Sequence, residues 1–224
     1  MRLTPFATFV LSATLLLAFS APASAQTFNS KSVFLAAAGT PFYTETFETV
    51  PIPKDVNFYG PFTKNGITYT PLAGSRTFNL VVSSPGYTNY GAGLNPTTSS
   101  ILTTSGDEWF RLTFASTVYG FGLDAYYNGL GPATTSFYNG STLLGSVSYN
   151  GAATIGFAGY LATLSAPITS VEFQSTSGGV LNTGIDNVMI YDTPVTTTAP
   201  EPASLALLAT GLVGIVAVGR RRRR

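Results

Sequence analysis

Between Thr27 and Asp192 the chain alternates short runs rich in Val, Ile, Thr, Tyr and Phe with clusters of Gly, Asn, Pro and Ser. This alternation is typical of antiparallel β-sheets, and no long helical period interrupts it. The clearest strand is predicted over residues 109–114, where Phe110, Leu112 and Phe114 share one face. Nine further strands are predicted over residues 42–48, 67–72, 78–83, 119–126, 134–138, 143–149, 155–161, 169–174 and 185–191.

Four Asn-Gly pairs predict tight hairpin turns, because both residues of this dipeptide tolerate the positive φ that type I′ turns require. The pairs begin at Asn65, Asn128, Asn139 and Asn150. The last three each follow a tyrosine and recur every eleven residues. Since eleven residues make one strand and its turn, this part of the chain is expected to form a meander of successive hairpins.

About ten strands in some 165 residues, with no helix to cover a sheet face, predict two sheets packed on each other. The expected fold class is all-β, an antiparallel β-sandwich of the jelly-roll type, with a barrel as the second choice. Residues 26–193 would form this single domain, and residues 194–202 a short extended stalk with the Pro-Glu-Pro motif at its end.

The N-terminal residues 1–25 have the pattern of a signal peptide. Met1 and Arg2 precede a largely apolar run from Phe6 to Phe19, and Ala23-Ser24-Ala25 supplies the small residues that signal peptidase accepts. Cleavage is predicted after Ala25, which leaves Gln26 at the new N-terminus.

The C-terminal segment has the pattern of a membrane anchor. Residues 203–219 are uncharged, and at about 1.5 Å per residue a helix of this length just crosses a bilayer core. The arginines that follow would hold that end in the cytoplasm, so the β-domain would lie on the far side of the membrane. This cluster consists of Arg220, Arg221, Arg222, Arg223 and Arg224.

The residues before this apolar span make the signal more specific. Pro200, Glu201 and Pro202 precede the span, and two prolines bar a helix and keep Glu201 extended. The order of this tripeptide, the apolar span and the arginines resembles the C-terminal signal of PEP-CTERM proteins. The resemblance covers about the last 25 residues. It implies recognition by an exosortase-like membrane enzyme, transfer to the cell surface or matrix, and an association with extracellular polysaccharide.

Composition narrows the chemistry of the domain. The chain contains neither cysteine nor histidine, so thiolate chemistry, the usual general base near neutral pH and the commonest metal ligand are all lacking. Between Gln26 and Pro200 there are five basic and nine acidic residues, a net charge of 5 − 9 = −4. A nucleic-acid partner is not expected, because no basic stripe is left to neutralise phosphates.

Carboxylate pairs are then the remaining route to catalysis, and a polysaccharide hydrolase is the alternative function. Asp107 and Glu108 are neighbours and Glu45 and Glu48 are three positions apart, so in straight strands each pair points to opposite faces. We therefore predict a structural or adhesive surface module and no enzyme.

Tyrosines near turns offer candidate contacts to sugar. Aromatic faces beside amides can bind sugar rings, and this combination occurs at Tyr87 and Tyr90 and again at Tyr126 and Tyr127. The alternative is that these rings pack beside turns and leave their hydroxyl groups in water.

A structural calcium site is a further expectation. Residues 45–48 and 184–188 look like the terminal strands of MAM-type and carbohydrate-binding jelly rolls, in which carboxylates meet at one edge. The resemblance implies Glu48 and Asp186 as ligands, and calcium suits an oxygen cage. Alternation predicts that Phe47 faces the core and Glu48 points outward, while Asp186 shares a face with Val188. The alternative is that both carboxylates only accept hydrogen bonds from backbone amides.

Overall fold

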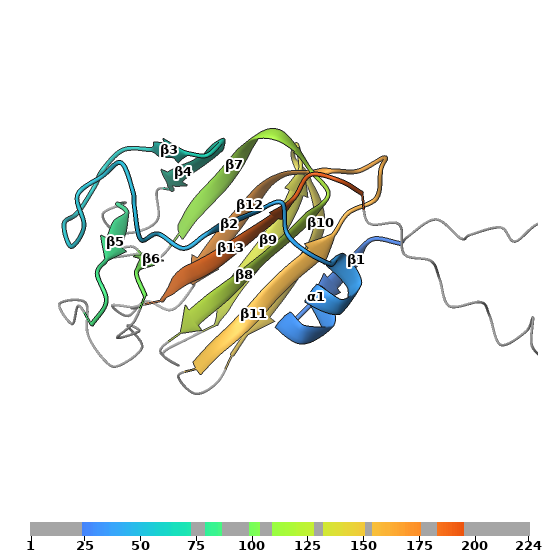
Figure 1. Cartoon of the computed structure of the whole chain (residues 1–224), viewed down its shortest axis with the longest axis horizontal. Coiled ribbons are helices and arrows are strands. Elements are labelled where there is room, and N and C mark those ends of the chain that lie inside the picture. The colour runs from blue at the N-terminus through green and yellow to red at the C-terminus, as the bar shows by residue number, and fades with distance from the viewer. Residues whose placement is uncertain are drawn as a thin grey trace, which may run out of the picture. The chain divides into compact units, whose positions relative to one another are not determined.

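The computed structural model describes residues 24–72, 79–86, 99–103, 109–127, 132–150, 154–175 and 183–194 (Figure 1), without the side chains of Tyr127 and Thr154. All of these residues belong to one compact unit, Pro22–Thr197. The predicted signal peptide up to residue 23, the sorting tripeptide, the apolar span and the arginine cluster lie outside the described residues.

One sheet has seven strands. In spatial order they run β1-β11-β8-β13-β6-β5, and β2 pairs with β13 beside this path. Their bounds are Gln26–Phe28 (β1), Tyr43–Glu45 (β2), Val81–Ser83 (β5), Ile101–Thr103 (β6), Gly120–Tyr127 (β8), Thr154–Leu161 (β11) and Gly184–Tyr191 (β13).

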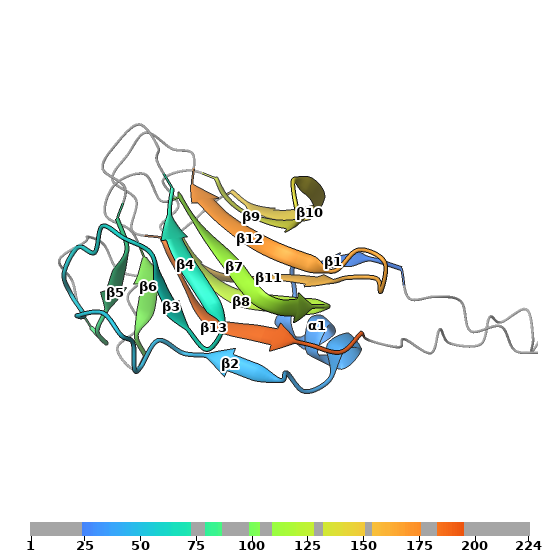
Figure 2. The ribbon, with the colours of Figure 1, turned by 90° about the horizontal axis from the view of Figure 1, so that it is seen from above.

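The second sheet has six strands in the order β10-β9-β12-β7-β4-β3 and is stacked on the first (Figure 2). Their bounds are Phe62–Lys64 (β3), Ile67–Pro71 (β4), Trp109–Val118 (β7), Ala133–Asn139 (β9), Thr142–Tyr149 (β10) and Ile168–Ser175 (β12). The described strand pairs are antiparallel, which confirms the predicted all-β sandwich.

The main hydrophobic core lies between the two sheets. Large side chains from both of them are fully buried there, among them Phe110, Phe121, Phe137 and Phe173. On β7 the alternation of buried Phe110 and Leu112 with exposed residues is the pattern predicted from the sequence. All ten predicted strands overlap observed ones, whereas the three-residue strands β1, β3 and β6 were not predicted.

The predicted meander is wrong. Only β9 and β10, of the four strands from β8 to β11, form a hairpin of neighbours, and β8 pairs with β11 in the other sheet. The chain therefore changes sheets before β9 and again after β10. Equal spacing of turns indicates that the strands have equal lengths. It does not indicate to which of the two sheets the next strand belongs.

The Asn-Gly turns differ from one another. Asn65 and Gly66 have φ of 50° and 76°, as a type I′ turn requires, and they join β3 to β4. In the β9–β10 hairpin only Gly140 has positive φ, 57°, because Asn139 stays in the strand opposite Thr142. The side-chain amide of Asn139 donates a hydrogen bond to the carbonyl oxygen of Pro167 at 2.8 Å, which holds the residue there.

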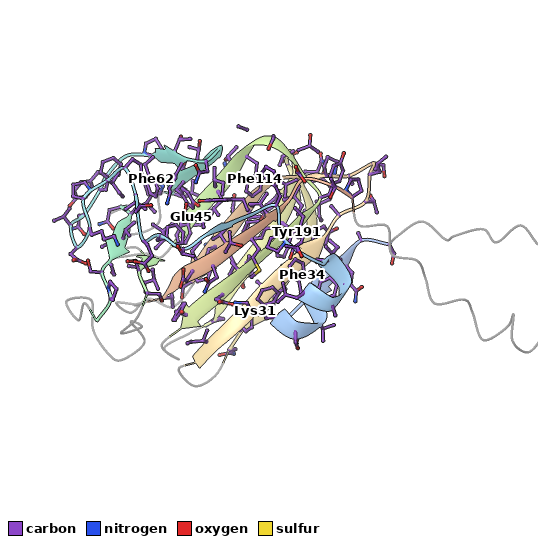
Figure 3. All side chains as sticks on the ribbon, viewed as in Figure 1. Lys31, Phe34, Glu45, Phe62, Phe114 and Tyr191 are labelled. Carbon is purple, nitrogen blue, oxygen red and sulfur yellow. The ribbon has the colours of Figure 1, made fainter. Side chains whose placement is uncertain are left out.

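A helix that the sequence analysis did not predict, α1 (Lys31–Ala38), packs on the seven-stranded sheet (Figure 1). Its Phe34 is fully buried, and its ring lies 5.2 Å from that of Phe157 and 5.5 Å from that of Tyr191 (Figure 3). Glycines in the sheet make room for this ring, since a Cβ at Gly122 or Gly159 would lie 2.9 or 2.8 Å from it. Eight residues are too few for a helical period to stand out in the sequence. Within the described part of the chain, no helix has the length and apolar character needed to cross a membrane.

Candidate functional site

Of the four tyrosines expected to contact sugar, the structure describes the side chain of Tyr126 alone. Tyr87 and Tyr90 lie outside the described residues, as does the side chain of Tyr127. Tyr126 is buried, and burial raises the pKa of its hydroxyl group, with Asp186 and Asp124 adding to the rise. In this structure the ring of Tyr126 therefore presents no open face to a ligand.

A β-bulge turns Asp186 away from the face predicted for it. The register of β13 against β8 shifts between Asp186 and Met189, and Asn187 within the bulge has φ of 49°. Val188 consequently faces the core between the sheets, whereas Asp186 lies opposite Asp124 of β8 on the other face of the seven-stranded sheet. The expectation that Asp186 and Val188 share a face was wrong because simple alternation does not survive a bulge.

Asp186 sits among other polar groups. It is only 1% exposed, and its Oδ1 accepts the backbone N–H of Asn187 at 2.6 Å. Burial is the main reason that the pKa of Asp186 is raised from 3.8 to about 6, and the negative charges of Asp124 and Glu48 contribute. Lys31 of α1 donates to Asp124 at 2.7 Å, and so does the side-chain amide of Asn187 at 2.8 Å.

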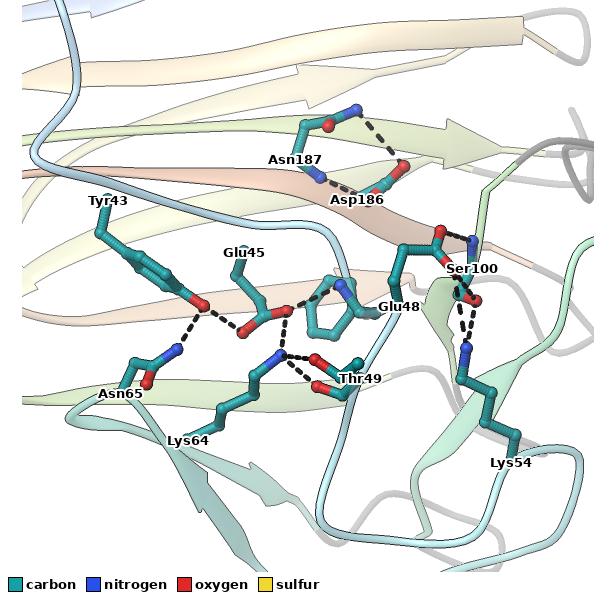
Figure 4. A network of polar contacts seen from close by, with 11 residues as sticks. Tyr43, Glu45, Glu48, Thr49, Lys54, Lys64, Asn65, Ser100, Asp186 and Asn187 are labelled. Carbon is teal, nitrogen blue, oxygen red and sulfur yellow. Dashed lines mark hydrogen bonds and ion pairs between the residues drawn. The ribbon is translucent and has the colours of Figure 1, made fainter.

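Glu48 follows β2 and points outward, as predicted, while Phe47 is fully buried in the core. Its carboxylate accepts hydrogen bonds from the backbone N–H of Ser100 at 2.8 Å and from the Ser100 hydroxyl at 3.0 Å (Figure 4). The backbone contact is the main cause that lowers the pKa of Glu48, and Lys54 lies 3.6 Å away. Among the described residues no group of three or more Asp or Glu side chains lies close enough together to hold a metal ion. Calcium binding by Glu48 and Asp186 stays a prediction.

A second polar network lies between the sheets and centres on Glu45, which is 1% exposed (Figure 4). Its Oε1 accepts from Lys64 at 2.8 Å and from the backbone N–H of Phe47 at 2.7 Å, and its Oε2 accepts from the Tyr43 hydroxyl at 2.6 Å. Lys64 also donates to the carbonyl oxygen of Thr49. Burial and then the contact to Glu45 raise the pKa of Tyr43 to about 12, so its hydroxyl remains a donor at physiological pH.

This network forms one wall of a groove of about 310 Å³. The groove lies between β2 and β13 of one sheet and β7 and the β3–β4 turn of the other. Polar groups in the lining come from Tyr43, Asn65 and Ser116, and large apolar side chains come from Phe42, Phe114 and Ile190. Its described lining contains no carboxylate, and so it offers no support for the alternative of a hydrolase with a carboxylate pair.

Phe42 is the most exposed large apolar residue of the groove lining, at 73%. It directly precedes β2, and its backbone N–H donates to the carbonyl oxygen of Ile190 at 2.8 Å, which fixes the start of that strand pairing. Sequence reasoning placed Phe42 in a strand but did not select it as a site residue. The groove joins segments about 20 to 150 residues apart, so no local motif indicates it.

The carboxylate pairs considered for catalysis are not assembled in the described part of the molecule. Asp107 and Glu108 lie outside the described residues. Glu45 faces the core side of the sheet and is paired with Lys64, whereas Glu48 contacts Ser100. These two glutamates therefore do not face each other.

Comparison with protein families gives one match, in which residues 198–224 fit the model described as the PEP-CTERM protein-sorting motif. A search of curated proteins found no match. Among solved structures, a family 29 carbohydrate-binding module from Piromyces equi is similar with a TM-score of 0.37 and 9% identity, over 63% of this chain and 92% of that one. The N-terminal endo-1,4-β-D-xylanase 10B of Clostridium thermocellum, with its CBM22-1 and GH10 modules and xylohexaose, has a TM-score of 0.31 and 13% identity, over 69% of this chain and 29% of that one.

Proposed function

From the PEP-CTERM sorting motif that the chain carries at residues 198–224, we infer an exported protein that reaches the cell surface or extracellular matrix, where its β-sandwich binds polysaccharide. The motif is the observation that carries the proposal, because it implies export, sorting to the cell surface and processing by an exosortase. The carbohydrate ligand is the finer part of the proposal and has separate support.

That support comes from the described surface. An exposed aromatic side chain lies beside a side-chain amide, because Phe42, which is 73% exposed, lines the groove together with Asn65. An aromatic face can pack against the C–H face of a sugar ring while an amide bonds its hydroxyl groups. The net charge of −4 between Gln26 and Pro200 argues against polyanions as the ligand class.

Glycan-array binding by the Gln26–Thr193 fragment tests this function. Both sheets and both hydrophobic clusters lie within these residues, so the fragment keeps the whole described core. Binding to a defined group of polysaccharides is the expected result. A fragment that melts cooperatively but binds none of them would leave sorting intact and refute the carbohydrate role.

A further inference from the structure

We propose that the groove between β2 and β7 is the sugar-binding site and that it takes a short stretch of an uncharged polysaccharide, with one ring packed on Phe42. This inference rests on the proposed carbohydrate function and adds the site and the ligand class. It makes no use of the tyrosines that the sequence analysis selected.

The groove presents an exposed aromatic ring. Phe42 is 73% exposed although it lies at the mouth of a groove lined largely by apolar groups, among them Phe114 and Ile190. Burying the side chain of a phenylalanine stabilises a protein, and here that stabilisation is forgone in the free chain. A ligand that covers the ring would recover it.

The same groove also carries polar groups. Asn65 is exposed, and its amide nitrogen donates to the hydroxyl oxygen of Tyr43 at 2.5 Å. No described residue donates to the amide oxygen of Asn65, so that oxygen is open to a hydroxyl group of a ligand. The exposed hydroxyl of Ser116, on the β7 side, offers a second donor and acceptor. An apolar wall with a few hydroxyl and amide groups suits a sugar better than a purely apolar peptide.

The absence of charge in the described lining limits the kind of sugar that the groove can bind. Among the described residues that line the groove, none is charged. Glu45 lies behind Tyr43, but it is 1% exposed and its charge is paired with Lys64. An anionic sugar would find no cation in the groove and would approach a domain of net negative charge. An uncharged polymer meets neither obstacle.

The polar side chains of the groove are rigidly held. The Asn65-Gly66 turn fixes the backbone of Asn65, and Tyr43 is held between Asn65 and Glu45 by hydrogen bonds of 2.5 and 2.6 Å. Side chains that are already ordered lose little entropy when a ligand binds. A volume of about 310 Å³ is at the small end of ligand pockets, so the groove holds a short stretch of polymer.

Calorimetric titration of the Gln26–Thr193 fragment with soluble neutral polysaccharides, such as β-glucan, xylan and mannan, and with acidic ones, such as alginate, tests the proposal. We expect binding to at least one neutral polymer and none to alginate. Phe42→Ala should weaken that binding about tenfold or more, equivalent to about 1.4 kcal/mol. Phe42→Trp should retain it, and Ser116→Ala should weaken it to a smaller extent.

Tyr59→Ala is the matched control, because Tyr59 is a 58% exposed aromatic residue beside an amide but does not line the groove. Its affinity should equal that of the unmodified fragment. If the unmodified fragment binds sugar and Phe42→Ala binds equally well, the groove assignment is wrong while the proposed function stands. If the unmodified fragment binds no polymer, both fail. A fragment that is dimeric and becomes monomeric on Phe42→Ala would make the groove a contact between copies and overturn the proposal.

Discussion

The ammonium group of Lys64, from the six-stranded sheet, lies 2.8 Å from Oε1 of Glu45, which belongs to the seven-stranded sheet and is 1% exposed. The pair therefore links the two sheets inside the sandwich. Lys64 also reaches the carbonyl oxygen of Thr49, so the segment that follows β2 is tied to the same point.

Removing one partner of this pair should destabilise the domain strongly. Lys64→Met leaves the Glu45 carboxylate buried without its cation, and such losses cost about 3–5 kcal/mol. Chemical denaturation of the Gln26–Thr193 fragment measures the effect. Glu45→Gln combined with Lys64→Met should recover part of it, because no unpaired charge then remains. A single Lys64→Met variant as stable as the unmodified fragment would contradict the structure at this point.

A pH effect on stability is expected from Asp186. Its pKa is raised from 3.8 to about 6, mainly by burial, so between these values the folded state binds more protons than the unfolded state. The free energy of unfolding therefore falls as pH rises from about 4 to 6, and the loss, up to about 3 kcal/mol, is complete above pH 6.

Asp186→Asn should remove this loss. In metal-free buffer we expect the variant to melt at a higher temperature than the unmodified fragment at pH 7.5 and at nearly the same temperature near pH 4. Asp192→Asn is a suitable control, because it removes the same charge from an exposed position on the chain segment after β13. If both variants raise the melting temperature equally at pH 7.5, the effect comes from the change in net charge and not from the burial of Asp186.

Calcium binding remains a separate prediction. Glu48 and Asp186 each accept a hydrogen bond from a backbone amide, that of Ser100 and that of Asn187, which is the arrangement expected of carboxylates without a metal. If calcium binds the folded domain, millimolar calcium should raise the melting temperature and a chelator should reverse the rise. At a calcium concentration one hundred times the Kd, the free energy of unfolding should increase by about 2.7 kcal/mol. Asp186→Asn should abolish the response. A melting temperature independent of calcium would exclude the site.

The sequence was sufficient to predict ten of the thirteen described strands and the sandwich, because a buried face repeats every second residue, as Phe110 and Leu112 show. It was not sufficient for features that depend on partners distant in the chain. The order of β8 to β11 in two sheets, and the groove that brings Phe42 beside Asn65 and Ser116, have no local signature.

Local exceptions to the strand pattern misled the prediction elsewhere. The bulge at Asn187 reversed the face on which Asp186 lies, and α1 was too short to produce a period. Tyr126 was selected because it lies near a turn, but its position on β8 buries it. Composition near turns does not distinguish a ring that packs from one that is exposed.

Removal of the C-terminal segment should change where the protein is found. The predicted span 203–219 and the arginines at 220–224 lie outside the described residues, and the described unit contains both sheets without them. A chain truncated after Thr198 should therefore fold and appear as a soluble exported domain in cell fractionation. Retention of the truncated chain in the membrane fraction would locate the anchor elsewhere.

The sorting motif itself gives the sharpest test of processing. Glu201 lies between Pro200 and Pro202 within the matched residues 198–224, and no carboxylate other than Glu201 occurs in that segment. In a host that contains the exosortase, Glu201→Ala should leave an unprocessed precursor, because the enzyme is expected to recognise the extended tripeptide with its single charge. Mass spectrometry of the membrane fraction would show this precursor with the C-terminal segment still attached, and Glu201→Asp, which keeps the charge, serves as the control. Normal maturation of Glu201→Ala would show that Glu201 does not direct processing, whatever the β-sandwich binds.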